Sequence, residues 1–221
     1  MSAERLLAVV GLIVSFLLLV RFGPAAWRAV RILGGVRRRR MADAGPLEIP
    51  PPEAVAGHVP ELTALGFRRI GERWLRLPGT PVRFEWVFGE PSGETYVVML
   101  PSFALGGILA ACFTSWDDGT WVQTNYPRGA VVEREQLRAA VVATSLPDAI
   151  AAHRRTVDRY RGALGRPRAI TTMADTLRMD ADYRSRHGGS TLGVLTARVM
   201  APAAGALVLV VVFALILVVA R

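Results

Sequence analysis

The amino-acid sequence predicts an α+β fold, a small antiparallel-sheet domain flanked by helices, with one transmembrane helix at each end. Three features lead to this prediction. Long apolar runs occupy both ends of the 221 residues, alternating apolar and polar residues mark strands in the middle, and helical periodicity follows the strands. The terminal runs leave enough chain for one modest domain between them.

The carboxy-terminal apolar run is the stronger of the two candidate membrane spans. Residues 199–220 contain no charged side chain, and a bilayer core of about 30 Å needs roughly 20 helical residues. The amino-terminal run, residues 6–20, would cover only about 22 Å as a helix. It reaches span length over 6–27 if Arg21 extends to the headgroups and Trp27 lies at the interface. A cleaved signal peptide is the alternative interpretation of this run.

Arginines dominate the segment that follows the first apolar run. All 27 basic residues of the chain are arginine, a composition typical of GC-rich bacterial genomes, and residues 21–40 hold seven of them with no acid. Short basic flanks stay cytoplasmic, so the sequence predicts a two-pass protein of the bacterial plasma membrane with both termini outside. The arginines expected to set this topology and to contact anionic lipid are Arg21, Arg28, Arg31, Arg37, Arg38, Arg39 and Arg40.

On this interpretation the chain has five parts. They are a transmembrane helix at 6–27, a basic juxtamembrane segment with a proline-rich linker at 28–52, a cytoplasmic α+β domain at 53–187, a Gly/Ser hinge at 188–198 and a second transmembrane helix at 199–220. Residues 44–197 contain 17 arginines and 16 acidic residues. A nearly neutral domain of this kind disfavours nucleic acid as a partner.

Periodicity indicates the elements of the central domain. Residues 53–67 carry apolar side chains at helical spacing, with Pro60 expected to split or kink the helix. Residues 82–90 alternate, which predicts a strand with one buried face and with Arg83 and Glu85 on the other side. Further strands are expected at 73–77, 94–102 and 106–116, giving an antiparallel meander of four or five strands.

The Asp-Asp-Gly sequence at Asp117, Asp118 and Gly119 predicts a hairpin turn between two arms rich in aromatic and β-branched residues. The two aspartates could instead form a catalytic pair. Turn chemistry explains both carboxylates without a reaction, so we interpret them as turn residues.

Helices are expected to close the domain. Residues 132–144 place Leu137 and Val141 on one helical face, and a helix over 148–165 begins after an N-cap at Ser145. A last short helix is expected within 173–187, before the Gly/Ser hinge. The second of these helices exposes four arginines, which form a solvated charged face or, alternatively, a site for phosphate or an acidic partner. They are Arg154, Arg155, Arg159 and Arg161.

No catalytic motif of the common hydrolase, nucleotide-binding, metalloprotease or thiol-redox types occurs in the chain. The histidines His58, His153 and His187 are far apart in sequence, and Cys112 lies in an apolar strand that favours a core role over a nucleophilic one. We therefore assign no catalytic residue, no cofactor and no metal site, and whether the protein is an enzyme stays undecided.

These observations predict an integral membrane protein that displays a small cytoplasmic α+β binding or scaffold module at the membrane face. The alternative is a membrane-bound, hydrolase-like enzyme whose site is not recognisable from sequence. The expected partners are a membrane with anionic lipid and a protein or small ligand on the central domain.

Overall fold

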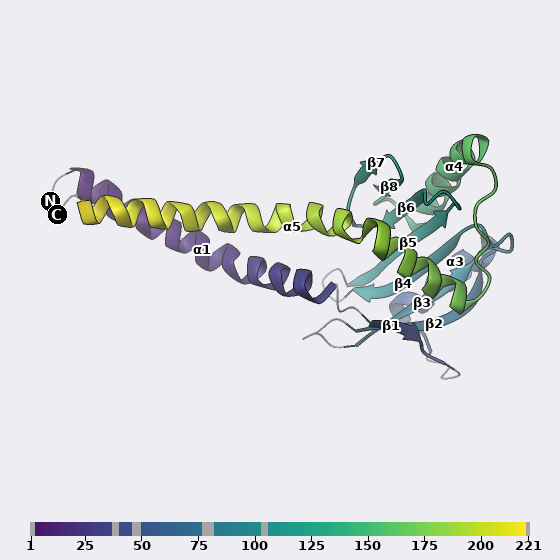
Figure 1. Cartoon of the computed structure of the whole chain (residues 1–221). Coiled ribbons are helices and arrows are strands. Elements are labelled where there is room, and N and C mark those ends of the chain that lie inside the picture. Colours follow the sequence, from purple (N-terminus) through teal and green to yellow (C-terminus); the bar gives the residue numbers. More distant parts are fainter. Residues whose placement is uncertain (1–2, 37–39, 46–49, 77–81, 103–105, 220–221) are drawn as a thin grey trace. The chain divides into compact units, whose positions relative to one another are not determined.

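A computed structural model describes residues 3–36, 40–45, 50–76, 82–102 and 106–219 (Figure 1). The chain divides into two compact units. One unit combines residues 1–38 with 192–221, and the other comprises residues 39–191.

An eight-stranded mixed sheet forms the centre of the 39–191 unit, with strand order β1-β2-β3-β4-β5-β6-β8-β7. Neighbours from β1 to β6 are antiparallel, whereas β8 pairs with β6 in parallel and with β7 in antiparallel. The sheet is therefore larger than the predicted meander and is not purely antiparallel. Its strands are β1 Arg40–Asp43, β2 Arg68–Arg76, β3 Arg83–Gly89, β4 Tyr96–Ser102, β5 Gly107–Ser115, β6 Trp121–Tyr126, β7 Val132–Arg134 and β8 Leu137–Val141.

The helix predicted over residues 132–144 is wrong, because this segment forms β7 and β8. Its Ala, Arg, Leu and Glu residues favour a helix locally, but helix propensity is worth only tenths of a kcal/mol per residue. Pairing with β6 buries Leu137 and Ala139 on alternate positions of β8. Tertiary pairing of this kind overrides a weak local preference.

Three helices cover one face of the sheet: α2 Glu53–Ala56, α3 Val59–Ala64 and α4 Leu146–Leu164. The predicted helix start after Ser145 is confirmed, since the Ser145 hydroxyl accepts a hydrogen bond from the Asp148 amide. The helices and strands together bury an apolar cluster against this face. It comprises Val55, Leu62, Phe67, Trp86, Phe88, Val97, Met99, Ile108, Ala110, Cys112, Leu146 and Ile150.

The opposite face is covered by the first part of the long helix α5, Met173–Val219 (Figure 1). The ring of Tyr183 lies 4.8 Å from that of Trp121, and the Ser115 hydroxyl donates to the Met179 sulfur. The strand β3 is therefore buried on both faces, and Glu85, predicted to lie on an exposed side, is only 6% exposed. The helix α5 is continuous through residues 188–198, where the sequence predicted a hinge.

The other unit consists of α1, Ala3–Val36, and the remainder of α5. Within α1, Ser15 is buried and donates a 2.7 Å hydrogen bond to the Gly11 carbonyl. The large apolar side chains of α1 that are at least half exposed are Leu6, Leu7, Val10, Ile13, Val14, Phe16, Leu17, Val20 and Trp27.

The two predicted transmembrane helices are not upheld. Among the described residues, no helix is long and apolar enough to cross a membrane. In α1 the apolar run stops at Arg21, and its 15 residues cover about 22 Å of a core that is about 30 Å thick.

This finding corrects several predictions together. The described residues form an α+β fold with a large mixed sheet, and none of their helices meets the requirement for a membrane span. The two-pass plasma-membrane location is wrong on the same ground. The function as an integral membrane protein is wrong as well, together with its membrane-bound enzyme alternative.

Candidate functional site

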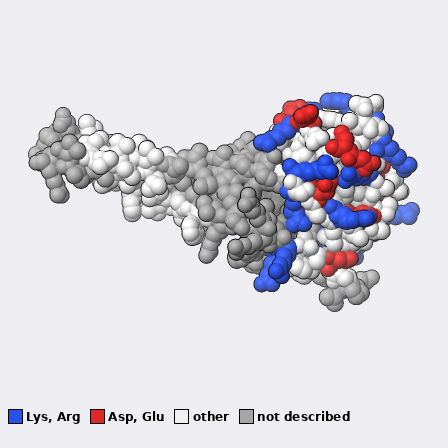
Figure 2. Space-filling model, viewed as in Figure 1, with Lys and Arg blue, Asp and Glu red and all other residues white. Residues whose placement is uncertain are grey.

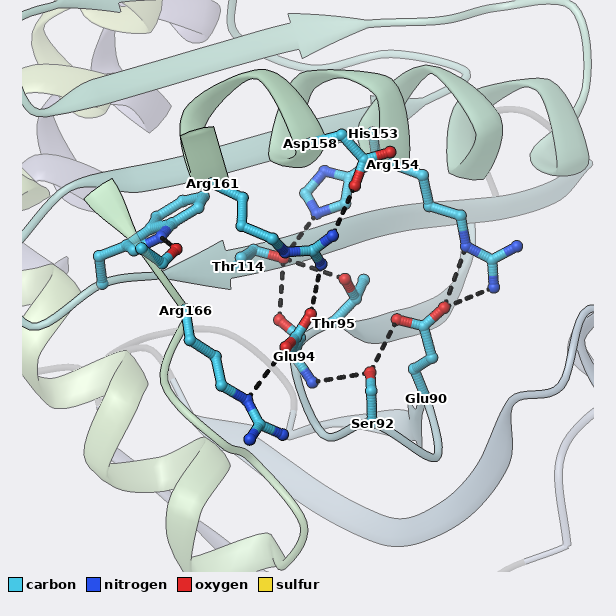
Figure 3. Close-up of polar contacts among 12 residues, drawn as sticks. Glu90, Ser92, Glu94, Thr95, Thr114, His153, Arg154, Asp158, Arg161 and Arg166 are labelled. Atoms are coloured by element: carbon cyan, nitrogen blue, oxygen red, sulfur yellow. Dashed lines mark hydrogen bonds and ion pairs between the residues drawn. The ribbon is translucent and has the colours of Figure 1, made fainter. Parts of the chain in front are cut away.

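A cluster of ion pairs joins the β3–β4 turn to α4 (Figure 3). Glu90 accepts hydrogen bonds from Nε and Nη2 of Arg154 at 3.0 and 2.6 Å. Glu94 accepts from Arg161 and, at 3.2 Å, from Nε of Arg166. Ser92 lies between the two carboxylates, donating to Glu90 and accepting from the Glu94 amide. The cluster borders a cavity of about 320 Å³, but its charges are already paired within the chain.

This pairing bears on the four arginines that the sequence placed on an exposed helical face. Arg154 and Arg161 are held by Glu90 and Glu94, whereas Arg155 and Arg159 are exposed. An incoming phosphate would have to compete with two carboxylates fixed in a tight turn. The arrangement therefore serves to attach the turn to α4 more readily than to bind an anion.

A buried threonine–histidine network lies directly beneath this cluster (Figure 3). His153 contacts the Thr114 hydroxyl through Nε2 at 3.0 Å and the Thr124 hydroxyl through Nδ1 at 3.1 Å. Thr114 donates its one hydroxyl proton to the Glu94 carbonyl, so Nε2 of His153 must be the donor to Thr114. In a neutral ring, Nδ1 then accepts from the Thr124 hydroxyl.

The environment of His153 keeps it neutral. The side chain is fully buried, and burial, with the nearby Arg154 charge, lowers the pKa of His153 to about 3. A ring that cannot reach solvent and does not take up a proton near neutral pH is unsuited to general acid–base catalysis. It acts as a hydrogen-bonding core residue, in agreement with the absence of a histidine motif.

Cys112 is equally unsuited to chemistry. It lies in β5 within the apolar cluster and is 1% exposed. Desolvation raises the pKa of the Cys112 thiol to about 12. Since the thiolate is the nucleophile, this cysteine behaves as a small core side chain.

The predicted turn residues lie between β5 and β6, where Gly119 has a φ of +91°. Asp118 accepts hydrogen bonds from the amide and hydroxyl of Thr120, both at 2.8 Å. Asp117 instead accepts from Nε of Arg168 at 2.7 Å. The two carboxylates thus have separate structural partners and do not act on a common point.

A larger, open groove of about 650 Å³ lies beside this turn. Arg168 crosses it, donating to Asp117 and, at 3.0 Å, to Asp182, while Asp175 pairs with Arg178. Hydrogen bonds from Arg186 and Arg168 lower the pKa of Asp182. Figure 2 shows acidic and basic side chains intermixed over the visible face of this unit, and the groove is lined in the same way by opposite charges that neutralise each other.

A third cavity, about 330 Å³ in volume, has a different character and is called the α3 cavity below. The aromatic side chains of Phe67 and Phe88 form its floor, and both are only 2% exposed. Gly66, with a φ of +89°, ends α3 and turns the chain so that Phe67 points inward ahead of β2. The complete lining is Pro51, Val59, Thr63, Phe67, Arg68, Arg69 and Phe88.

Two consecutive arginines at the mouth of the α3 cavity differ in their partners. Arg69 donates from Nε to Glu72 at 2.5 Å. Arg68 is exposed and forms no ion pair with any residue that the structure describes. The cavity therefore combines an apolar floor with a guanidinium that has no carboxylate partner within the described chain.

Sequence reasoning did not identify this cavity. Phe67 and Phe88 are brought together by the pairing of β2 with β3, in which Arg68 opposes Gly89. The glycine that ends α3 and the alternating pattern of β3 could be recognised in the sequence. The register between β2 and β3 could not. No local motif marks the site.

The arginines predicted to contact lipid are only partly within the described residues. Arg21 is exposed on α1, and Arg40 is exposed at the start of β1. Arg28 and Arg31 lie in α1, with side chains outside the description, and Arg37, Arg38 and Arg39 lie outside the described residues altogether. Their contact with lipid stays a prediction.

Among the described side chains, no group of three or more His, Cys, Asp or Glu residues could hold a metal ion. Comparisons of the chain with protein-family models, curated proteins and solved structures returned no match. The functional argument therefore rests on the geometry of the cavities.

Proposed function

We propose that the 39–191 unit is a binding module that holds a small, largely apolar ligand in the α3 cavity. The observation that carries the proposal is a cavity of about 330 Å³ with two aromatic side chains on its floor and a guanidinium at its mouth. Ligand sites typically measure roughly 300–1,000 Å³ and combine apolar walls with a few polar groups.

The titratable groups outside the α3 cavity are engaged in structural contacts, which favours a binding role over a catalytic one. The carboxylates Glu90 and Glu94 are engaged by arginines, and Asp117 and Asp182 are engaged by Arg168. His153 and Cys112 have pKa values shifted by burial in the direction that keeps each of them uncharged. These groups are therefore occupied with holding the fold together.

The proposal can be tested on the full chain with the neutral fluorescent probe N-phenyl-1-naphthylamine. We expect saturable binding with one site per chain. Thr63→Trp should abolish it by filling the cavity, because Thr63 lines the cavity from an exposed helical position. Ala64→Trp is the matched control, since Ala64 is exposed on the same helix and does not line the cavity. Equal binding by both variants would place the probe elsewhere and refute the proposal.

A second proposal concerns lipid. We propose that the unit formed by residues 1–38 and 192–221 contacts the surface of an anionic membrane. Large apolar side chains of α1, among them Leu7 at 69% and Leu17 at 61% exposure, form an apolar surface next to the exposed Arg21. Exposed apolar surface of this extent is typical of protein or membrane contact sites, and each arginine near an acidic leaflet contributes about 1 kcal/mol.

Vesicle flotation tests this second proposal. The chain should float with vesicles containing phosphatidylserine at low salt. A variant with Arg37, Arg38, Arg39 and Arg40 changed to glutamine should bind less, and the difference should shrink as salt screens the charges. Equal flotation with phosphatidylcholine vesicles would contradict the electrostatic contribution. A stable dimer in light scattering that excludes vesicles would assign the apolar surface to a second copy of the chain.

A further inference from the structure

We infer that the ligand of the α3 cavity is an amphipathic anion, with an apolar body on the aromatic floor and a carboxylate or phosphate group bound by Arg68. This inference rests on the proposed binding function and adds the chemical class of the ligand.

The first argument is that the nearby carboxylates have other partners. Glu72 is 6% exposed and is held by Arg69, the neighbour of Arg68 in β2. Glu90 follows Gly89, the residue that opposes Arg68, and it is bound through two guanidinium nitrogens of Arg154. Arg68 is therefore left as the cation at the cavity mouth without a described acidic partner.

The second argument is the sign of the charge around the cavity. Arg154 lies with its guanidinium carbon 5.5 Å from the centre of the Phe67 ring, so a second cation borders the aromatic floor. The charged residues that line the cavity are Arg68 and Arg69, and Arg69 is paired with Glu72, which leaves an excess of one positive charge. A ligand with one negative charge completes the balance, whereas a cationic ligand is repelled.

The third argument is geometric. The guanidinium of an arginine presents parallel N–H donors that match the oxygens of a carboxylate or phosphate. Arg68 lies at the first position of β2, directly after Phe67, whose side chain is buried in the floor. Arg68 lines the same cavity as Phe67 and Phe88, so its guanidinium is available to the polar end of a ligand whose apolar body rests on these rings.

A matched series of eight-carbon ligands tests the inference by calorimetry on the full chain. Octanoate should bind about tenfold more tightly than octan-1-ol, the factor expected for a hydrogen bond to a charged group. Octylammonium should bind more weakly than octan-1-ol. Octyl phosphate is compared with octanoate to decide which anionic group is preferred. Arg68→Gln should remove the preference for octanoate over octan-1-ol, whereas Arg83→Gln, an exposed position outside the cavity, should retain the preference.

The outcomes separate this inference from the binding function. Equal affinity of the wild-type chain for octanoate and octan-1-ol overturns the inference and leaves the binding function standing. A preference that persists in Arg68→Gln overturns the role of Arg68. Absence of binding by all four ligands overturns both proposals.

Discussion

Beneath α4 the sheet buries a neutral histidine, whereas beneath α5 it buries an ion pair. On the α4 side, the ring nitrogens of His153 are hydrogen-bonded to the hydroxyls of Thr114 and Thr124. On the α5 side, Nε of Arg73 donates to Glu85 at 2.8 Å, and both side chains are less than 10% exposed. Each face buries a polar side chain away from water. On the α4 face hydroxyl groups supply its hydrogen bonds, whereas on the α5 face a side chain of opposite charge does so.

The comparison indicates where the molecule is most sensitive. A neutral group that loses a hydrogen bond costs roughly 1–3 kcal/mol, while a charge that loses its partner in the interior costs more. Arg73 also has one nitrogen, Nη1, that is buried without a hydrogen-bond partner. The stability of the α5 face therefore depends more strongly on buried charges than that of the α4 face does.

The largest effect is expected from Glu85→Ala, which leaves the buried Arg73 guanidinium without its carboxylate. The free energy of unfolding, measured by urea titration, should fall by about 3–5 kcal/mol. The double variant Arg73→Met with Glu85→Leu should recover much of this loss, because it removes both charges. A loss below about 1 kcal/mol for Glu85→Ala would mean that the ion pair does not support this face.

On the α4 face, a change of pH tests the contribution of His153 to the free energy of unfolding. The pKa of His153 is lowered by burial to about 3 in the folded chain, while in the unfolded chain it is near 6.5. Between these values the unfolded state binds one more proton, so stability falls as the pH falls below 6.5, by about 1.4 kcal/mol per pH unit. His153→Gln should lack this component in urea titrations between pH 7 and 4; the same slope in wild type and variant would contradict the assignment.

A smaller effect is expected at the Asp117–Gly119 turn, which contacts α5. Gly119 has a φ of +91°, and an added Cβ would meet the Arg186 side chain. Gly119→Val should therefore destabilise the fold by about 1–3 kcal/mol. Asp117→Asn should change stability by less than about 1 kcal/mol, since the ion pair with Arg168 is exposed on the aspartate side. Thermal unfolding of both variants gives the comparison, and a larger cost for Asp117→Asn would reverse this interpretation.

The reactivity of the Cys112 thiol tests the packing of the α4 face without a substitution. The thiol is buried on the α4 face and its pKa is raised to about 12, so it should not react with 5,5′-dithiobis(2-nitrobenzoate) at pH 8 in the folded chain. One thiol per chain should react in 6 M guanidinium chloride. Rapid reaction of the native protein would show that the α4 face opens readily.

Local signals account for the elements that could be predicted from the sequence. The helix after Ser145 follows from its N-cap, and the strands over 82–90 and 94–102 follow from alternation or β-branched residues between breakers. The prediction over 132–144 was wrong because pairing with β6 outweighs local helix propensity. The terminal spans were predicted from apolar composition, and the described helices do not meet the requirement for a span.

Local signals in the sequence predict where a helix or strand begins and ends, since caps, breakers and alternating side chains act over a few residues. Only the tertiary structure decided that α5 buries Glu85 with Arg73, that Glu90 and Glu94 hold the arginines of α4, and that Phe67 and Phe88 meet in one cavity. Each of these contacts joins residues distant in sequence. Their formation depends on strand register and on the face that a helix covers, and neither quantity is encoded in a short segment.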